Sequence, residues 1–255
     1  MPEIKLGSDV LFSIGSMPVT TSVFSAYLIS LLLIVFAVWQ RTQIKMIPGR
    51  MQMVMELFVG YFYGELLSAF GNEKDARRFS AYIMTLFIFI LIVNQFSLLP
   101  LIGQIVTKDG INIYKTATGD WSLTLVLALI SIGFTNLLAF FISPIRHIGN
   151  FIKLGPIFSI KSLKELPMAI LDFFLGLLDI IGEASKVISL SARLLGNILA
   201  GEIMYIIIAS LSVYTQFLLP MPFVALSIFS GLVQAYVFAF LSLQFMAGTI
   251  RSVTE

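Results

Sequence analysis

The chain has 255 residues, of which 58% are hydrophobic and only 12% are charged, and its net charge is +2. A soluble domain of this length needs more polar residues to cover its surface, so this composition predicts a protein that uses lipid as its solvent. The small net charge argues against nucleic-acid binding, the lack of cysteine excludes disulfides, and the single histidine, His147, excludes a multi-histidine metal or haem site. We expect no cofactor and no metal.

Five apolar runs are long enough to cross a bilayer, at residues 23–39, 79–101, 123–143, 166–213 and 223–250. The fourth run is too long for one upright crossing, so we expect a tilted helix or a helix with a broken turn, followed by a long, tilted fifth helix. Residues 1–22 do not resemble a removable signal peptide and are interpreted as an outer segment. The predicted fold is an all-α membrane protein with a single membrane domain over residues 1–255.

Residues 44–70 are apolar but begin with Pro-Gly and contain Glu56 and Glu65, a mixture that predicts an amphipathic helix lying along the inner membrane surface.

Basic residues in the connections between the spans predict the orientation of the chain in the membrane. Six of them lie between the first two spans, whereas only Lys108 and Lys115 follow the second. The positive-inside rule therefore predicts that the N-terminus is outside and the C-terminus is inside, as five crossings require.

The fourth apolar run carries polar residues at helical spacing: Asp172, Asp179, Glu183, Lys186, Arg193 and Asn197. At 100° per residue they fall within a sector of about 80°, so one face of a membrane helix carries a polar stripe. Glu183 and Lys186 are an (i, i+3) pair and Asp179 lies one turn earlier, so three of these charges can neutralise one another. For Glu183 and Lys186, a structural and a functional role both remain open.

Arg193 differs from the other charges of the stripe because no acid lies at contact spacing on its own helix. The residues three and four positions away are Ser189, Leu190, Gly196 and Asn197. A guanidinium at the middle of a membrane costs about 2.5 to 3.5 kcal/mol even on a lenient scale, so it requires a partner on another helix or another chain. We interpret Arg193 as functional.

Glu202 lies nine residues beyond Arg193, which places it on the opposite helix face and roughly 13 Å along the axis. We interpret it as a proton relay that lines an aqueous cavity, in preference to a structural hydrogen bond. Gln234 of the last span could reach the arginine face, whereas the small residues around it are interpreted as packing positions. His147, beside Arg146 in a basic connection, is interpreted as a solvated loop residue and not as a proton carrier.

The segment SLSARLLGNILAGEI resembles the signature of subunit a of the F-type ATP synthase. The segments NQFSLLP (94–100), TGDWSLTLVLAL (118–129), LDIIGEASKVISLS and LVQAYVFAFL also resemble this family. The resemblance places Arg193, Asn197 and Glu202 on the family's essential arginine, its adjacent asparagine and its half-channel acid.

The chain departs from the family pattern at four positions. Val187 stands where many members have Pro, Ser97 replaces a common Gly or Asp, and Asp179 replaces a frequent Glu. Ser227 stands where some members have a histidine that partners the acid, so the inlet relay here would depend on Glu202 and water.

The resemblance implies a non-catalytic stator subunit that packs against a rotating ring of c subunits and is held by the peripheral stalk subunit b. Two half-channels would open to opposite sides, and the residues implied in proton translocation are Arg193, Asn197, Glu202, Gln234, Asp120, Asp179, Glu183, Lys186 and Ser227. For Asp120, capping of a helix start is an equally good explanation. A bacterial inner (plasma) membrane is the expected location, with the mitochondrial inner membrane as the alternative.

Two other functions compete with this interpretation. A self-contained secondary transporter would show inverted repeats or paired broken helices, and neither is visible in the sequence. A structural scaffold would use its charges for assembly alone, against which the unpartnered Arg193 weighs. The coupling ion stays open between H⁺ and Na⁺, because the ion-binding carboxylate would belong to the ring.

Overall fold

The structure is a computed structural model that describes residues 10–14, 17–97, 119–151, 166–210 and 220–254. Its elements in chain order are β1 (Val10–Ile14), β2 (Met17–Thr20), α1 (Thr21–Thr42), α2 (Arg50–Phe70), α3 (Glu73–Ser97), α4 (Trp121–Ile142), α5 (Pro144–Phe151), α7 (Leu166–Ser210) and α8 (Met221–Thr254). The predicted segments 1–9, 98–101 and 211–213, with Lys108 and Lys115, lie outside the described residues.

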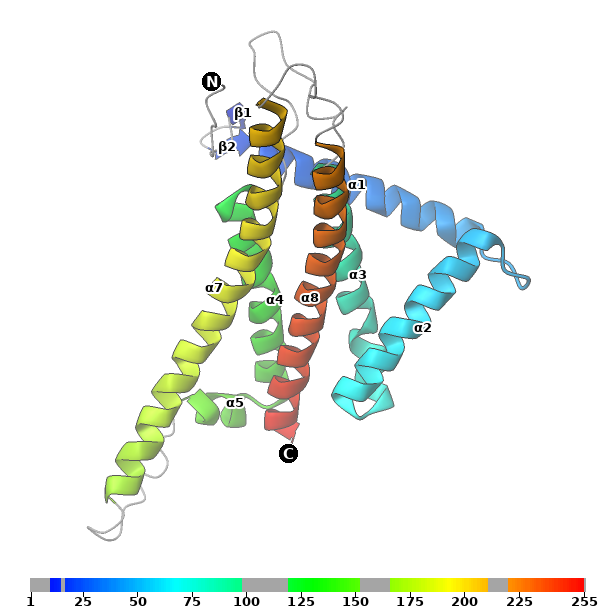
Figure 1. Ribbon diagram of the computed structural model, residues 1–255. Coiled ribbons are helices and arrows are strands. Elements are labelled where there is room, and N and C mark those ends of the chain that lie inside the picture. Colours follow the sequence, from blue (N-terminus) through cyan, green and yellow to red (C-terminus); the bar gives the residue numbers. More distant parts are fainter. Residues whose placement is uncertain (1–9, 15–16, 98–118, 152–165, 211–219, 255) are drawn as a thin grey trace.

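The predicted all-α membrane fold is confirmed. Six of the described helices, namely α1, α2, α3, α4, α7 and α8, are long and apolar enough to cross a membrane. This is one more than the five predicted, because α2 also meets the length and composition of a span. The antiparallel hairpin of β1 and β2 was not predicted, and it precedes α1 at the end of the molecule opposite the C-terminal turn of α8 (Figure 1).

The core lies where α3, α4, α7 and α8 pack together, and the C-terminal half of α2 adds to it against α3 (Figure 1). On α3, Ile83, Ile90 and Asn94 are buried at the helical spacing that forms one inward stripe. At the end of this stripe the amide of Asn94 donates to the carbonyl of Gly231 on α8, at 3.3 Å. The neighbouring Gln95 donates to the carbonyl of Ile228, at 3.0 Å. These two hydrogen bonds fix the axial position of α8 relative to α3.

Helix α7 is a single uninterrupted helix of 45 residues, so the broken turn considered from the sequence is absent. At 1.5 Å per residue it is about 68 Å long, which exceeds the thickness of a bilayer including its headgroups. Figure 1 shows it crossing the bundle obliquely, with its N-terminal end extending beyond α4 and α8. Such a helix can present residues at both ends of the bundle along one continuous face.

Helices α1 and α2 form a V beside the bundle (Figure 1). The helix predicted over residues 44–70 begins only at Arg50, with Gly49 as its N-cap and Pro48 before it. It ends at Gly71, whose φ of +67° is the left-handed conformation that suits glycine. There Arg251 of α8 donates to the carbonyl of Ala69, at 2.5 Å. The last turns of α2 are therefore bonded to the last turns of α8.

Candidate functional site

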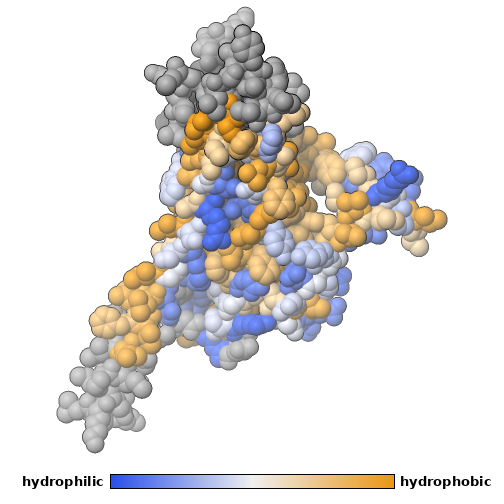
Figure 2. Space-filling model, in the orientation of Figure 1, coloured by the Kyte–Doolittle hydropathy of each residue, from blue (hydrophilic) through white to orange (hydrophobic). Residues whose placement is uncertain are grey.

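Hydrophilic residues form a band between apolar surfaces over α7 and α8 and continue into the more polar lower end of the bundle (Figure 2). Because α7 is one helix through the whole stripe, the single-face geometry expected from the sequence applies to it. Along this face Asp179 is exposed and Glu183, Lys186 and Asn197 are half-buried. The side chain of Asp172 lies outside the described part.

Arg193 projects from the middle of this band. Its neighbours Leu190 and Leu194 are 1% and 0% exposed and anchor α7 in the core, whereas the arginine itself is exposed. Arg193 makes no hydrogen bond or ion pair with any residue that the structure describes. The requirement for a partner, which was inferred from the sequence, is therefore not met within the described chain.

One turn after Arg193, a hydrogen bond between side chains links α7 to α8. The hydroxyl of Ser230 donates to Oδ1 of Asn197. Gln234, one turn further along α8, is buried and its amide nitrogen has no hydrogen-bond partner among the described residues. The structure thus joins Ser230 to the stripe, and it shows no bond between Gln234 and Arg193.

The two helices lie close together beside Glu202. A Cβ atom at Gly201 would lie 3.2 Å from Oγ of Ser227 on α8, so only glycine allows this separation without adjustment. Glu202 is half-buried and makes contacts of its own within the chain. Ser227 therefore borders the residue next to Glu202.

Asp120 is the N-cap of α4, as the alternative explanation from the sequence requires. Its carboxylate accepts a hydrogen bond from the backbone nitrogen of Ser122, at 3.2 Å. It also accepts one from the hydroxyl of Ser22 on α1, at 3.4 Å. These bonds satisfy a helix end and link α1 to α4.

The opposite end of the polar band opens into a cavity of about 450 Å³ between α5, α7 and α8. Its ionisable lining consists of Asp179, Glu183 and Lys186 from α7 with His147 from α5, and α8 adds Gln244 and Thr249. Titratable groups that converge in one hollow can exchange protons with water, so this cavity is the second polar region of the site.

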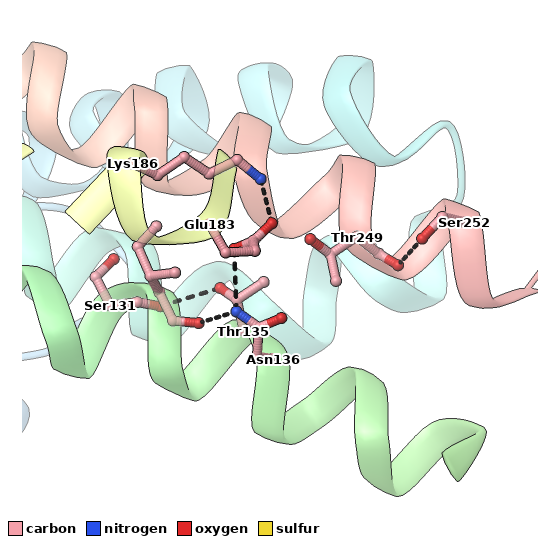
Figure 3. A network of polar contacts seen from close by, with 8 residues as sticks. Ser131, Thr135, Asn136, Glu183, Lys186, Thr249 and Ser252 are labelled. Carbon is pink, nitrogen blue, oxygen red and sulfur yellow. Dashed lines mark hydrogen bonds and ion pairs between the residues drawn. The ribbon is translucent and has the colours of Figure 1, made fainter. Parts of the chain in front are cut away.

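Glu183 is held in this cavity by two helices (Figure 3). One carboxylate oxygen, Oε1, pairs with the ammonium of Lys186. The other, Oε2, accepts a hydrogen bond from the amide of Asn136 on α4, at 3.1 Å. The ammonium of Lys186 also lies 5.1 Å from the centre of the Phe245 ring on α8. The neutralising pair predicted from the (i, i+3) spacing is thus present.

The interpretation of His147 as a solvated loop residue is wrong. It lies in the short helix α5, packed against α4 and α7, and is only 7% exposed. Burial lowers its pKa from the usual 6.5 by disfavouring the imidazolium, and the Glu183 carboxylate opposes this by raising it. The flanking basic residues suggested solvation, but the tertiary contacts of α5 determine the burial of this side chain.

Comparison with known proteins gives one consistent family. A family model described as "ATP synthase A chain" matches residues 20–247. A protein from Moorella thermoacetica named "ATP synthase subunit a" is 31% identical over 242 residues, which cover 94% of this chain and 95% of that protein. The chain belongs to the ATP synthase subunit a family.

Two further members of this family are similar over nearly the whole chain. A protein from Propionigenium modestum named "ATP synthase subunit a, sodium ion specific" is 30% identical over 98% of this chain and 81% of its own length. The subunit a of Enterococcus hirae is 29% identical over 95% of this chain and 97% of its own length. The chain is therefore a bacterial membrane protein and a subunit of the F-type ATP synthase complex.

In this member of the subunit a family, two polar side chains that contact the stripe were not identified from the sequence. Ser230 was interpreted as a packing residue, although it lies one turn before Gln234 on the same face. Asn136 was not singled out, although it is an amide within the strongly apolar run LISIGFTNLLAFFI. A polar residue in an otherwise apolar helix was the available signal in both cases.

Proposed function

We propose that this chain provides two offset half-channels for ions and that Arg193 separates them at the surface facing the rotating c-ring. The observation that carries the proposal is an exposed arginine, in the middle of a polar band, that has no partner in the described chain. A ring carboxylate would supply the missing anion. The coupling ion is proposed to be H⁺.

The energetics support a role in ion release. A ring carboxylate at about 4 Å from the guanidinium would gain on the order of 4 kcal/mol at an effective dielectric of 20. That gain favours the ionised carboxylate by roughly a thousand-fold, so a bound proton is expelled as the site reaches the arginine. Arginine suits this position better than lysine because it does not release its own proton.

The outer half-channel is proposed to pass between α7 and α8 near Glu202. The close approach of Gly201 and Ser227 puts a hydroxyl beside the acid, and Asn197 with Ser230 forms the next polar step toward Arg193. Gln234 lies one turn beyond Ser230 and is buried with an unused donor, which a water molecule in the path would satisfy. For Asp120 the capping bonds are the better-supported role.

The inner half-channel is proposed to be the cavity lined by Asp179, Glu183, Lys186 and His147. It opens at the end of the bundle near the C-terminal turn of α8, where the positive-inside rule places the cytoplasm. On α7, Lys186 and Arg193 are separated by seven residues, or about two helical turns. The cavity therefore begins on the same helix face as the arginine.

Subunit b of the peripheral stalk is proposed to pack in the groove between α1, α2 and α3. This groove has a volume of about 1000 Å³ and is lined mainly by apolar side chains such as Leu33, Phe36, Val59 and Leu91. An apolar helix of subunit b would cover this apolar lining. The lipid bilayer would cover the remaining exposed apolar surface.

The proposal is tested with Arg193→Ala and Arg193→Lys in the assembled complex. Arg193→Ala should abolish ATP-driven acidification of inverted bacterial vesicles while the complex still assembles, because loss of a costly charge need not destabilise the helix. Passive proton leak through the complex should stay or rise. Arg193→Lys should also impair pumping, because an ammonium lacks the planar fork and can lose its proton.

The matched control is Ser189→Ala, which removes a polar group one turn earlier on α7 and should pump like the wild type. All rates are normalised to the amount of assembled complex. Pumping by Arg193→Ala at the wild-type rate would refute the proposal. The chain reconstituted without the other subunits should transport no solute, whereas a secondary transporter would.

A further inference from the structure

We propose that Asn136 of α4 is a positioning residue for ion passage through the inner cavity, and that it acts by holding the Glu183 carboxylate in place. The inference rests on the proposed function of that cavity. It adds a residue of another helix to the inner half-channel. The contacts that carry it are those between α4 and α7 shown in Figure 3.

The orientation of the Asn136 amide is set by its neighbours. Its nitrogen lies 3.0 Å from the carbonyl oxygen of Ile132 and 3.1 Å from Oε2 of Glu183. Both neighbours are acceptors, so the nitrogen and not the oxygen must face them. One amide nitrogen with two hydrogens thus ties the backbone of α4 to the carboxylate of α7.

The other atom of this amide, its oxygen, lowers the stability of the folded chain. The amide oxygen of Asn136 is buried and accepts no hydrogen bond from any residue that the structure describes. A buried acceptor without a partner is unfavourable, whereas leucine has the same branched shape with two methyl groups in place of the amide and would fill an apolar helix face without that cost. Packing between α4 and α7 therefore does not explain an asparagine here, but the bond to Glu183 does.

The geometry of Glu183 shows what the bond accomplishes. Lys186 binds the first carboxylate oxygen, but it lies on the same helix and has a long, flexible side chain. Asn136 binds the second oxygen from a different helix with a short side chain. The two donors together fix the position of the carboxylate group. Without the hydrogen bond from Asn136, the side chains of Glu183 and Lys186 can move together as a pair, away from the mouth of the cavity.

A fixed carboxylate matters for ion passage because proton exchange requires donors and acceptors within hydrogen-bond reach. Glu183 lies between Asp179 and Lys186 in the lining of the cavity. A carboxylate whose position is set by α4 keeps a constant distance to water in the cavity, whatever the state of the ring. Asn136 itself has no group that titrates, so its effect on transport has to pass through Glu183.

The experiment compares four forms of the complex in inverted vesicles: wild type, Asn136→Leu, Glu183→Gln and the double variant. ATP-driven acidification is measured as a function of pH and is normalised to assembled complex. Asn136→Leu should lower the pumping rate about five-fold or more and shift the pH of half-maximal pumping, because a hydrogen bond to a charged group is lost. In the Glu183→Gln background the same change should have no further effect.

The matched control is Thr135→Val, which removes the adjacent hydroxyl on α4, one that donates to the carbonyl of Ser131 at 3.0 Å and does not contact Glu183. It should leave the rate and the pH profile unchanged. If Asn136→Leu does not assemble, Asn136→Ala removes the donor without adding bulk or charge, and is read in the same way.

The outcomes separate this inference from the proposed function. Wild-type pumping by Asn136→Leu, or an equal loss in the presence and absence of Glu183, would overturn the role of Asn136 alone. Normal pumping by Glu183→Gln would overturn the assignment of Glu183 to the inner half-channel, and this inference with it. Slower pumping by Glu183→Gln, together with no further loss in the double variant, would support both the role of Asn136 and the assignment of Glu183 to the inner half-channel.

Discussion

The close contact between α7 and α8 beside Glu202 gives a prediction about the packing of these two helices. A methyl group at Gly201 would meet Oγ of Ser227 at 3.2 Å and its Cβ at 3.6 Å. The first distance is tighter than an ordinary contact, so the helices must separate slightly or Ser227 must rotate. Overpacking of this kind costs about 1 to 3 kcal/mol. Replacement of glycine by alanine in a helix interior otherwise stabilises by about 0.5 to 1 kcal/mol.

Gly133 of α4 is the matched control, because a Cβ there meets nothing within 4 Å. The helix-propensity gain is common to Gly133→Ala and Gly201→Ala, so the difference between their stabilities isolates the packing cost. Gly201→Ala should therefore be less stable than Gly133→Ala by about 1 to 3 kcal/mol. Thermal unfolding of the purified complex, followed by loss of subunit a from the assembly, measures the difference.

The contact also predicts a specific suppressor. Ser227→Ala removes the oxygen at 3.2 Å and leaves only the ordinary contact at 3.6 Å. In the Gly201→Ala background it should recover most of the lost stability, because the two residues touch and their effects are not additive. If Gly201→Ala is as stable as Gly133→Ala, or if Ser227→Ala gives no recovery, the packing of α7 on α8 described here is incorrect.

Two further predictions concern titratable groups. Glu202→Gln keeps the shape of the side chain but removes its proton exchange, so ATP-driven pumping should slow at unchanged complex abundance; an unaltered rate would remove Glu202 from the path. Burial lowers the pKa of His147, so between the usual 6.5 and its folded value the unfolded chain binds more protons than the folded one. The thermal midpoint should thus decrease as the pH is lowered through this range, and His147→Gln should weaken that dependence; equal slopes in both proteins would contradict it.

The helices were largely predictable from the sequence, because length and hydropathy determine them. The run at 123–143 corresponds to Trp121–Ile142, and the run at 223–250 corresponds to Met221–Thr254. Local chemistry explains one of the two largest deviations, the start of α2 at Arg50 in place of residue 44. Proline and glycine at positions 48 and 49 favour a turn, so the helix begins after them.

The contacts between helices were less predictable, for a physical reason. Periodicity shows which face of α7 is polar, and it anticipated the pair of Glu183 and Lys186 because both lie on one helix. It does not show which residue of another helix meets that face. Asn136 and Ser230 approach α7 only through the packing of α4 and α8, and His147 is buried only because α5 folds against α7.

The charges of α7 are satisfied in two different ways, and the difference argues for how the chain works. Glu183 pairs with Lys186 and also accepts a hydrogen bond from Asn136, so this part of the stripe is compensated within the chain. Arg193 has no such compensation among the described residues, although a bare guanidinium at the middle of a membrane is costly. A chain that can pair two charges through its own helices could pair a third. That Arg193 is left open therefore argues that its anion comes from another molecule, and an anion that arrives and leaves is what a rotating ring provides.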